Sequence, residues 1–147
     1  MSLNEFLNVH AYNFMMSDTT RKMSFNAPSG EIGSTGGQMV EDDSSIDTCR
    51  SIDDLVLFSF DFPAPDYVKI DIDGQELAVV KGMVRTLPRL KGVLIEVSSK
   101  TVDDVVEIMV ANGFTTENSF NDFRPHSTER RLFEGIDATN IIFTRRG

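Results

Sequence analysis

The strongest constraint on the fold of this chain is an alternation of strand-like and helix-like segments in its second half. Residues 92–97 form an apolar run of the kind that a parallel sheet buries on both faces. On each side of this run, at 77–87 and 102–110, apolar residues recur at the spacing of a helix that packs one face against a core. Strand-like runs lie further out at 67–72 and 140–144. The order strand, helix, strand, helix, strand predicts an α/β layer fold with right-handed crossovers.

The ends of the two predicted helices carry recognisable signals. Asp73 and Glu76 are placed as the N-cap and the first-turn acid of the first helix, and Pro88 is expected to end it. The second helix is expected to stop at Asn112-Gly113, because glycine readily adopts the left-handed conformation that ends many helices. A weaker strand is expected at 114–120.

The first third of the chain favours short strands joined by turns. The three predicted strands are 9–16, 22–26 and 46–50. Ser51, three residues before Asp54, then begins a short helix that is expected to run to Phe58. We therefore predict a single, partial domain over the whole chain, with a strand and hairpin region at 1–50 and an α/β core at 51–147.

Charge and composition exclude several classes of function. The 147 residues carry 23 acidic and 14 basic side chains, and the net charge of -9 has the wrong sign for holding nucleic acid or an anionic membrane. No apolar run approaches the roughly 18 residues of a membrane span, and no signal peptide is recognisable, which predicts a cytoplasmic protein. Cys49, the single cysteine, cannot form an internal disulfide. Segment 41–61 holds seven acids against one base, Arg50, and we interpret it as a solvated connecting face.

Candidate catalytic residues follow the predicted strands, because ligands of open α/β sheets bind at the carboxyl ends of strands. This criterion selects Asp71, Asp73, Glu96 and Val97. The two-residue period of a strand places Lys69, Asp71 and Asp73 on one face, where an unpaired buried charge would be costly. Lys69 therefore needs a partner, and Asp71 or Glu96 is expected to supply it. Such a pair either fixes the strand register alone or marks a functional site, and its position at the strand ends favours function.

The run D-I-D-G at 71–74 also suggests a calcium loop, but its spacing does not fit one. With Asp73 at the fifth loop position, Lys69 would occupy the first ligand position and Val80 the twelfth. A magnesium ion at Asp71 and Asp73 is a weaker alternative. With two histidines and no cysteine partners for them, a usual zinc site is also excluded, and we predict no metal site.

Two loops are candidates for substrate contacts. The glycine-rich segment 33–37 lacks the Lys-Ser/Thr ending of a phosphate-binding loop and is interpreted as a hairpin tip. Residues 121–139 form a long connection between the last two strands, typical of a lid or substrate loop. This connection contains Arg124 and His126, and His126 is either a general base or a solvated loop residue.

Four segments, 68–77, 90–97, 112–114 and 140–143, together resemble the C-terminal half of S-adenosylmethionine-dependent methyltransferases of the FkbM type. The most specific element is V-K-I-D-I-D-G-Q-E at 68–76, and weaker matches extend the resemblance over nearly the whole chain. The resemblance implies a Rossmann-like sheet. It also implies transfer of a methyl group to a hydroxyl of a sugar or of a natural-product-like small molecule.

The resemblance further implies roles for individual residues. Asp71 and Asp73 would contact S-adenosylmethionine. Asp71, Glu96 or His126 would orient the acceptor hydroxyl or remove its proton, and methyl transfer depends mainly on these two tasks. The residues expected to contact the acceptor are Arg124, Ser34 and Thr35.

The chain departs from the family pattern at its start. Family members begin with a strand and a glycine-rich turn that hold the cofactor. A second strand follows, which ends in an acidic residue that binds the ribose hydroxyls. The residues before Val9 supply neither of these two units. Two such units need about 60 residues. We therefore expect a fragment or truncated relative that by itself binds S-adenosylmethionine weakly or not at all. The alternative is a non-catalytic interaction module that has lost the cofactor-binding half.

The absent units also bear on assembly. In the family's strand order, residues 67–72 lie beside the absent first strand, so their outer edge would carry unpaired N–H and C=O groups. Residues 9–16 would lose their neighbour as well. Symmetric pairing of two copies satisfies both copies at once, so we expect a homodimer through one of these two segments.

Overall fold

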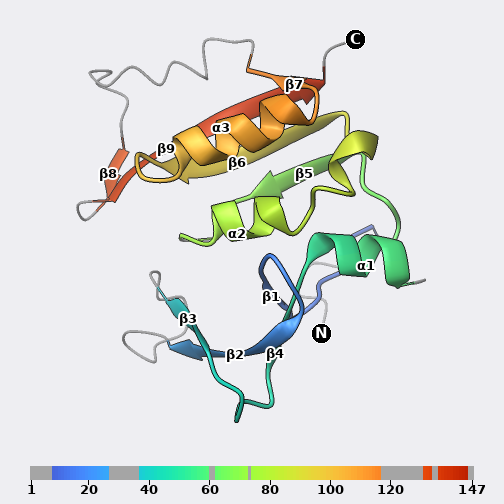
Figure 1. Ribbon diagram of the computed structural model, residues 1–147, viewed down its shortest axis with the longest axis vertical. Helices are drawn as coiled ribbons and strands as arrows, with labels where there is room; N and C mark the ends of the chain where they lie inside the picture. The colour runs from blue at the N-terminus through green and yellow to red at the C-terminus, as the bar shows by residue number, and fades with distance from the viewer. Residues whose placement is uncertain are drawn as a thin grey trace.

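The computed structural model describes residues 8–26, 37–59, 62–72, 74–116, 131–133 and 136–145. In chain order, the elements are β1 (Met15–Met16), β2 (Arg21–Asn26), β3 (Gln38–Glu41), β4 (Thr48–Arg50), α1 (Ile52–Phe58), β5 (Tyr67–Ile70), α2 (Glu76–Lys81), the 3₁₀ turn η1 (Leu87–Arg89), β6 (Gly92–Ser98), α3 (Val102–Ala111), β7 (Phe114–Thr115), β8 (Arg131–Phe133) and β9 (Ile136–Arg145). They form a mixed α/β structure with two sheets (Figure 1).

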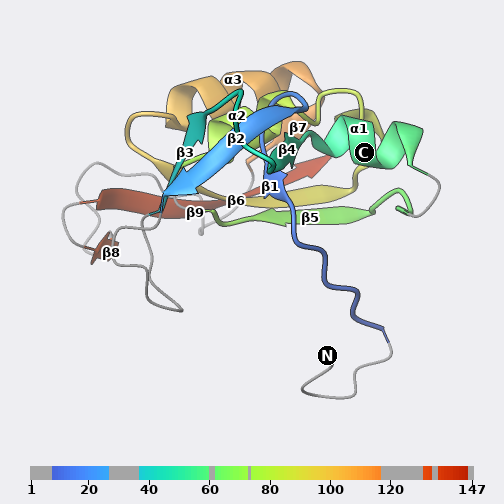
Figure 2. The same cartoon turned by 90° about the horizontal axis from the view of Figure 1, so that it is seen from below.

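The larger sheet has the strand order β5-β6-β9-β7, with β8 paired to β9. Strand β6 runs parallel to β5 and antiparallel to β9, and β9 is antiparallel to β7. In Figure 2 the helices α1, α2 and α3 lie on one side of this sheet. The predicted α/β class and the predicted order of strands and helices are therefore confirmed.

The hydrophobic core lies between this sheet and the helices. Alternate residues of β6 and β9 face α2, α3 and η1, and each fully buried side chain contributes about 1.5–3 kcal/mol to folding. The buried core residues include Val93, Ile95, Val97, Ile141, Phe143, Val79, Val80, Met83, Leu87, Val105 and Met109. This one-sided core fixes the positions of the strand ends at which a site can form.

The opposite face of the sheet is more open than the sequence predicted. In β6, Leu94, Glu96 and Ser98 alternate with buried residues and are half-buried. Lys69 of β5 has a side chain that is 61% exposed. The expectation that these strands are buried on both faces is wrong for the described residues, because the described helices all cover the same face (Figure 2). We call the uncovered side the open face.

The segment between β5 and β6 forms shorter elements than its periodicity predicted. Strand β5 ends at Ile70 rather than at 72, and α2 ends at Lys81 with Gly82 as its C-cap. Residues 82–86 then form turns, and Pro88 lies inside η1 instead of ending a long helix. Helix α3, by contrast, ends as predicted before Gly113, which has φ +84°.

The smaller sheet has the order β1-β4-β2-β3. Asn26 lies opposite Gln38 in the antiparallel pair β2 and β3, so the predicted hairpin connection is confirmed, although its tip lies outside the described residues. The predicted strand at 9–16 is wrong over 9–14: its observed part, β1, pairs through Met15 and Met16 with the short strand β4. The prediction also missed β3.

The C-terminal strand is longer than the sequence predicted. Seven pairs join β6 to β9, from Gly92 opposite Thr144 to Ser98 opposite Ala138. Strand β8 pairs with the start of β9, so part of the predicted 121–139 loop is strand. The extension follows from pairing along the full length of β6, which a pattern of apolar residues does not reveal.

The carboxylate of Asp53 joins α1 to the turn that follows α2. It accepts hydrogen bonds from the backbone N–H of Arg85 at 2.9 Å, the N–H of Thr86 at 2.8 Å and the hydroxyl of Thr86 at 2.7 Å. Its own N–H donates to the Gly82 carbonyl at 2.9 Å. Asp53 is buried, so the interpretation of 41–61 as a solvated face is wrong at this residue.

Gly82 brings the two sheets into contact. A Cβ atom at this position would lie 2.3 Å from the backbone oxygen of Ser17, in the turn between β1 and β2. Ser17 is fully buried, and its N–H donates to the carbonyl of Arg50 at the end of β4 at 2.9 Å. The turn after α2 therefore packs directly on the backbone of the smaller sheet.

The substitution Gly82→Ala is expected to lower the free energy of unfolding by about 1–3 kcal/mol, because the new methyl group must displace the backbone of Ser17. Urea unfolding followed by circular dichroism measures the change. Lys81→Ala, at the exposed neighbouring position, is the control and should stay within about 0.5 kcal/mol of the original chain. Equal stability of the two variants would contradict the close packing at Gly82.

Candidate functional site

The carboxyl ends of β5 and β6 place polar side chains in a row on the open face. Ile70 lies opposite Ile95, so Asp71 follows at the level of Glu96. Glu96 in turn lies opposite Asn140 of β9. Asp71, Glu96 and Asn140 therefore cross three neighbouring strands. We call these three residues, together with Lys69, the strand-end site.

Asp71 is held by charged and polar neighbours. The Lys69 ammonium lies 2.7 Å from Asp71 Oδ2. This hydrogen bond holds the pKa of the Asp71 carboxyl below its ordinary value of 3.8; partial burial opposes the shift, and a hydrogen bond with Glu96 adds to it. Asp71 is therefore ionised near neutral pH. The expected pairing of Lys69 with Asp71 is confirmed, but it lies on an exposed face instead of a buried one.

The turn after β5 directs the chain into α2. Gly74 has φ +97°, a conformation that favours glycine, and a Cβ there would meet no atom within 4 Å. Its N–H donates to Glu76 Oε1 at 2.9 Å, and Glu76 is buried. Glu76 therefore stabilises this turn and is the first-turn acid that was predicted. The predicted N-cap at Asp73 is wrong, because α2 begins at Glu76 with Gln75 as its N-cap, and no side chain caps it. The space beside Gly74 is left open.

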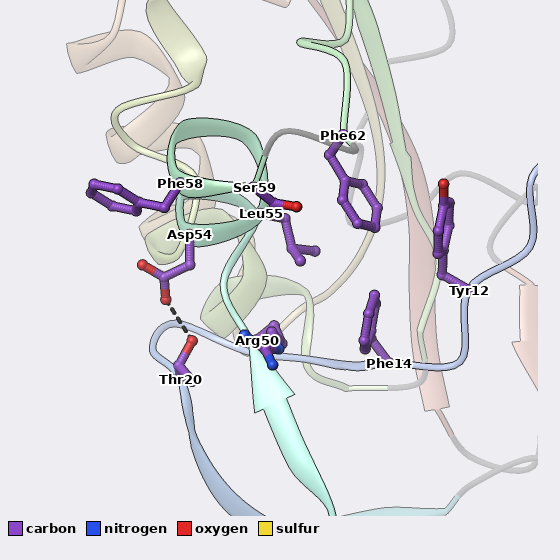
Figure 3. Close-up of a pocket in the computed structure, with 9 residues that line it drawn as sticks. All are labelled: Tyr12, Phe14, Thr20, Arg50, Asp54, Leu55, Phe58, Ser59 and Phe62. Atoms are coloured by element: carbon purple, nitrogen blue, oxygen red, sulfur yellow. Dashed lines mark hydrogen bonds between the residues drawn. The ribbon is translucent and has the colours of Figure 1, made fainter.

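A second candidate is a pocket of about 600 Å³ that opens beside α1. Its walls come from the segment before β1, the end of β4, α1 and the segment after α1 (Figure 3). The lining residues are Tyr12, Phe14, Thr20, Arg50, Asp54, Leu55, Phe58, Ser59 and Phe62. We call this the aromatic pocket.

Three rings cluster at one side of the aromatic pocket. The ring centroids of Tyr12 and Phe62 lie 4.4 Å apart, and those of Phe14 and Phe62 lie 6.0 Å apart. The guanidinium of Arg50 lies over the Phe14 ring, 5.8 Å from its centroid. Figure 3 shows these rings on one side of the pocket and Asp54 with Thr20 on the other.

Asp54 is bound by the groups beside it. The Thr20 hydroxyl donates to Asp54 Oδ2 at 2.5 Å. This bond and a further one from the Ser51 side chain hold the pKa of Asp54 below its ordinary value of 3.8, against a smaller opposing effect of burial. Asp54 therefore stays ionised near neutral pH, with its charge already stabilised by its own chain.

The structure brings together some of the predicted site residues and leaves others undescribed. Asp71 and Glu96 lie side by side, as their strand-end positions suggested. The predicted residues outside the described parts of the chain are Asp73, Ser34, Thr35, Arg124 and His126. The aromatic pocket was missed. The feature of the sequence that could have indicated this pocket is the spacing of Tyr12 and Phe14. Two residues apart in an extended segment, their side chains lie on the same side of it.

Within the described ranges of the chain, no group of three or more His, Cys, Asp or Glu side chains is placed to hold a metal ion. None of the helices in these ranges is long and apolar enough to cross a bilayer.

Lys69→Met is expected to raise the pKa of Asp71 toward 3.8, because the ammonium donor is lost. A lowered carboxyl pKa contributes stability that is present above the ordinary pKa and is lost as pH falls through the lowered one. The stability advantage of the original chain should therefore exist above about pH 4 and disappear in stronger acid. A carboxyl-carbon NMR titration measures the pKa, and urea unfolding measures the stability.

Lys91→Met is the matched control for this titration. Lys91 forms an equivalent exposed ion pair, with 2.8 Å between its Nζ and Asp66 Oδ1, away from Asp71. Its loss should leave the Asp71 titration unchanged. An unchanged Asp71 pKa in Lys69→Met would show that the observed ion pair does not determine the charge of Asp71.

Comparison with known proteins identifies one family. The family model for the methyltransferase FkbM domain matches residues 7–116 of the 147. No curated protein and no solved structure matches the chain significantly. The matched range contains both the strand-end site up to Glu96 and the lining of the aromatic pocket. The chain therefore belongs to the FkbM methyltransferase domain family.

Proposed function

We propose that this chain is part of an S-adenosylmethionine-dependent O-methyltransferase acting on a hydroxyl of a sugar or of a natural-product-like small molecule. Family membership supports methyl transfer in general. The observation that carries the assignment to this site is the hydrogen-bonded pair Asp71 and Glu96 at the carboxyl ends of two parallel strands. Ligands of open α/β sheets bind at such strand ends.

The chemistry of the strand-end site fits the cofactor. S-adenosylmethionine supplies a methyl group bound to a sulfonium, which is an electrophile with a positive charge. Asp71 carries a negative charge near neutral pH and lies on the open face, so it can attract a cationic group and accept hydrogen bonds from hydroxyls. Asp71 is the described residue that would hold the cofactor, and Asp73 is its proposed companion.

Asp71 is better suited to orienting an acceptor hydroxyl than to deprotonating it alone. A general base works best when its pKa lies near the working pH, and the pKa of Asp71 is lowered. Glu96 lies beside Asp71 on the neighbouring strand, so an acceptor hydroxyl between the two carboxyl groups can donate its hydrogen bond to either one. Lys69 keeps Asp71 in position.

Asp71→Asn is expected to reduce methyl transfer at least tenfold while changing the free energy of unfolding by about 1 kcal/mol or less, since the side chain is 46% exposed. The assay follows a radioactive methyl group from S-adenosylmethionine, at millimolar concentration, to hydroxyl-bearing acceptors. Asp104→Asn, at an exposed position of α3, is the control and should keep full activity.

Calorimetry with S-adenosylmethionine separates the possible outcomes of this assay. We expect weak binding or no binding by this chain alone, and saturable binding at low micromolar concentration would contradict that expectation. If Asp71→Asn leaves turnover unchanged, Asp71 is not part of the site. No binding and no turnover at any concentration would favour a non-catalytic interaction module.

A second copy of the chain is the proposed partner at the β5 edge. Within the described residues β5 pairs with β6 alone, so one side of this strand is open. Antiparallel pairing of two β5 strands with Ile70 at the two-fold axis puts Lys69 opposite Asp71 of the partner subunit, twice. Opposite charges facing each other across strands contribute about 0.2–1 kcal/mol per pair. This charge complementarity supports a homodimer.

Light scattering over a range of protein concentrations tests this pairing. Lys69→Asp should weaken the dimer, because it places like charges opposite each other. Combining Lys69→Asp with Asp71→Lys restores opposite charges and should restore the dimer. Lys91→Asp is the control at an unrelated ion pair. A monomer at all concentrations, or a double variant as weak as the single one, would contradict the proposed interface.

A further inference from the structure

The aromatic pocket exposes aromatic rings of a kind that is usually buried in a folded protein. Tyr12 is 52% exposed and Phe14 is 40% exposed, although the two residues lie close to Phe62 and partly cover one another. The extended segment 9–14 that carries them forms no strand. Contiguous exposed apolar surface on a folded protein commonly marks a place where something binds.

The volume of this pocket suits a small molecule. Its volume of about 600 Å³ lies within the range of roughly 300–1,000 Å³ that ligand pockets occupy. The side chain of Leu55, which is almost fully buried, points into it from α1, and the rings of Phe14 and Phe62 lie to one side (Figure 3). These walls offer apolar contact to a flat ring, which aromatic side chains favour by stacking or edge contact.

Arg50 gives the pocket a specific charge. It is the single base of the acid-rich segment 41–61, yet no carboxylate lies within 4.0 Å of its guanidinium in the described parts of the chain. The nearby Asp54 takes its hydrogen bonds from Thr20 and Ser51, while the charge of Arg50 acts on it through space. The guanidinium of Arg50 rests on the face of Phe14, so its N–H donors can bind an anion at the rim of the aromatic cluster.

We propose that the aromatic pocket binds a small aromatic carboxylate. The ring of the ligand lies against Phe14, Phe62 and Leu55, and its carboxylate receives hydrogen bonds from Arg50. The other charge of the pocket, Asp54, lies on the opposite side and is already hydrogen-bonded by Thr20. At the aromatic cluster itself, the guanidinium of Arg50 disfavours a cationic ligand, and a purely apolar ligand leaves its donors without a partner. This inference does not rest on methyl transfer, because it uses none of the residues of the strand-end site.

The tyrosines of this chain allow binding to be observed at the pocket itself. The chain has two tyrosines, Tyr12 and Tyr67, and no tryptophan. With ring-labelled tyrosine, the variant Tyr67→Phe leaves one set of NMR signals, which belongs to the pocket. Three matched probes are titrated: 2-naphthoate, the neutral 2-naphthalenemethanol and the cationic 2-naphthylmethylammonium.

The carboxylate probe is expected to shift the Tyr12 signals saturably and to bind about tenfold more tightly than the neutral probe, with the cation weakest. A hydrogen bond to a charged group is worth about 1.5–3 kcal/mol, which corresponds to tenfold or more in affinity. Arg50→Gln should remove the preference for the carboxylate and leave binding of the neutral probe unchanged. Phe14→Ala should weaken all three probes.

Arg89→Gln, at an exposed position of η1 outside the pocket, is the control and should bind like the original chain. Equal affinity for the carboxylate and the neutral probe, or a preference that survives in Arg50→Gln, would overturn the proposed anion recognition. Absence of saturation up to 10 mM would overturn the site itself. Tyr12 signals that shift with protein concentration alone would show that a second copy of the chain covers the pocket, and would also overturn the proposal.

Discussion

The arrangement of this molecule depends on the buried carboxylate of Asp53. Three donors from the turn after α2 converge on it, and its own N–H holds the carbonyl of Gly82. A buried carboxylate is tolerated because these bonds replace its hydration, and losing them would leave buried N–H groups unpaired. The bonds end α2 early and press Gly82 onto the backbone of Ser17. Both the orientation of α1 and the contact between the two sheets follow from this junction.

The one-sided covering of the larger sheet determines where chemistry can occur. The described helices lie on one face of this sheet. Lys69, Asp71 and Glu96 are exposed or half-buried and alternate with buried residues, so they face the other side. Their charges are then held by one another and by water, so no fully buried ion pair is required. An ionised carboxylate that is accessible at a strand end can meet a ligand, whereas the same group under a helix would serve packing alone.

The two candidate sites differ in their physical character. The strand-end site is small, charged and built on paired strands whose register fixes its residues. The aromatic pocket is larger and combines a cluster of rings with polar side chains, and one of its walls is a segment without strand pairing. Rigid strands position polar groups closely, while ring contacts tolerate small displacements. The first arrangement suits a reaction, and the second suits recognition of a ligand by shape and a single charge.

The sequence by itself determined the α/β class, the order of the central elements, the caps at Ser51 and Gly113, and the proximity of Asp71 to Glu96. These features depend on residues close together in the chain or on the two-residue and 3.6-residue periods. The tertiary structure alone decided the length of β9, the early end of α2, the open face and the aromatic pocket. Each of these arises from contacts between residues far apart in sequence, such as Asp53 with Thr86, for which a local pattern carries no signal.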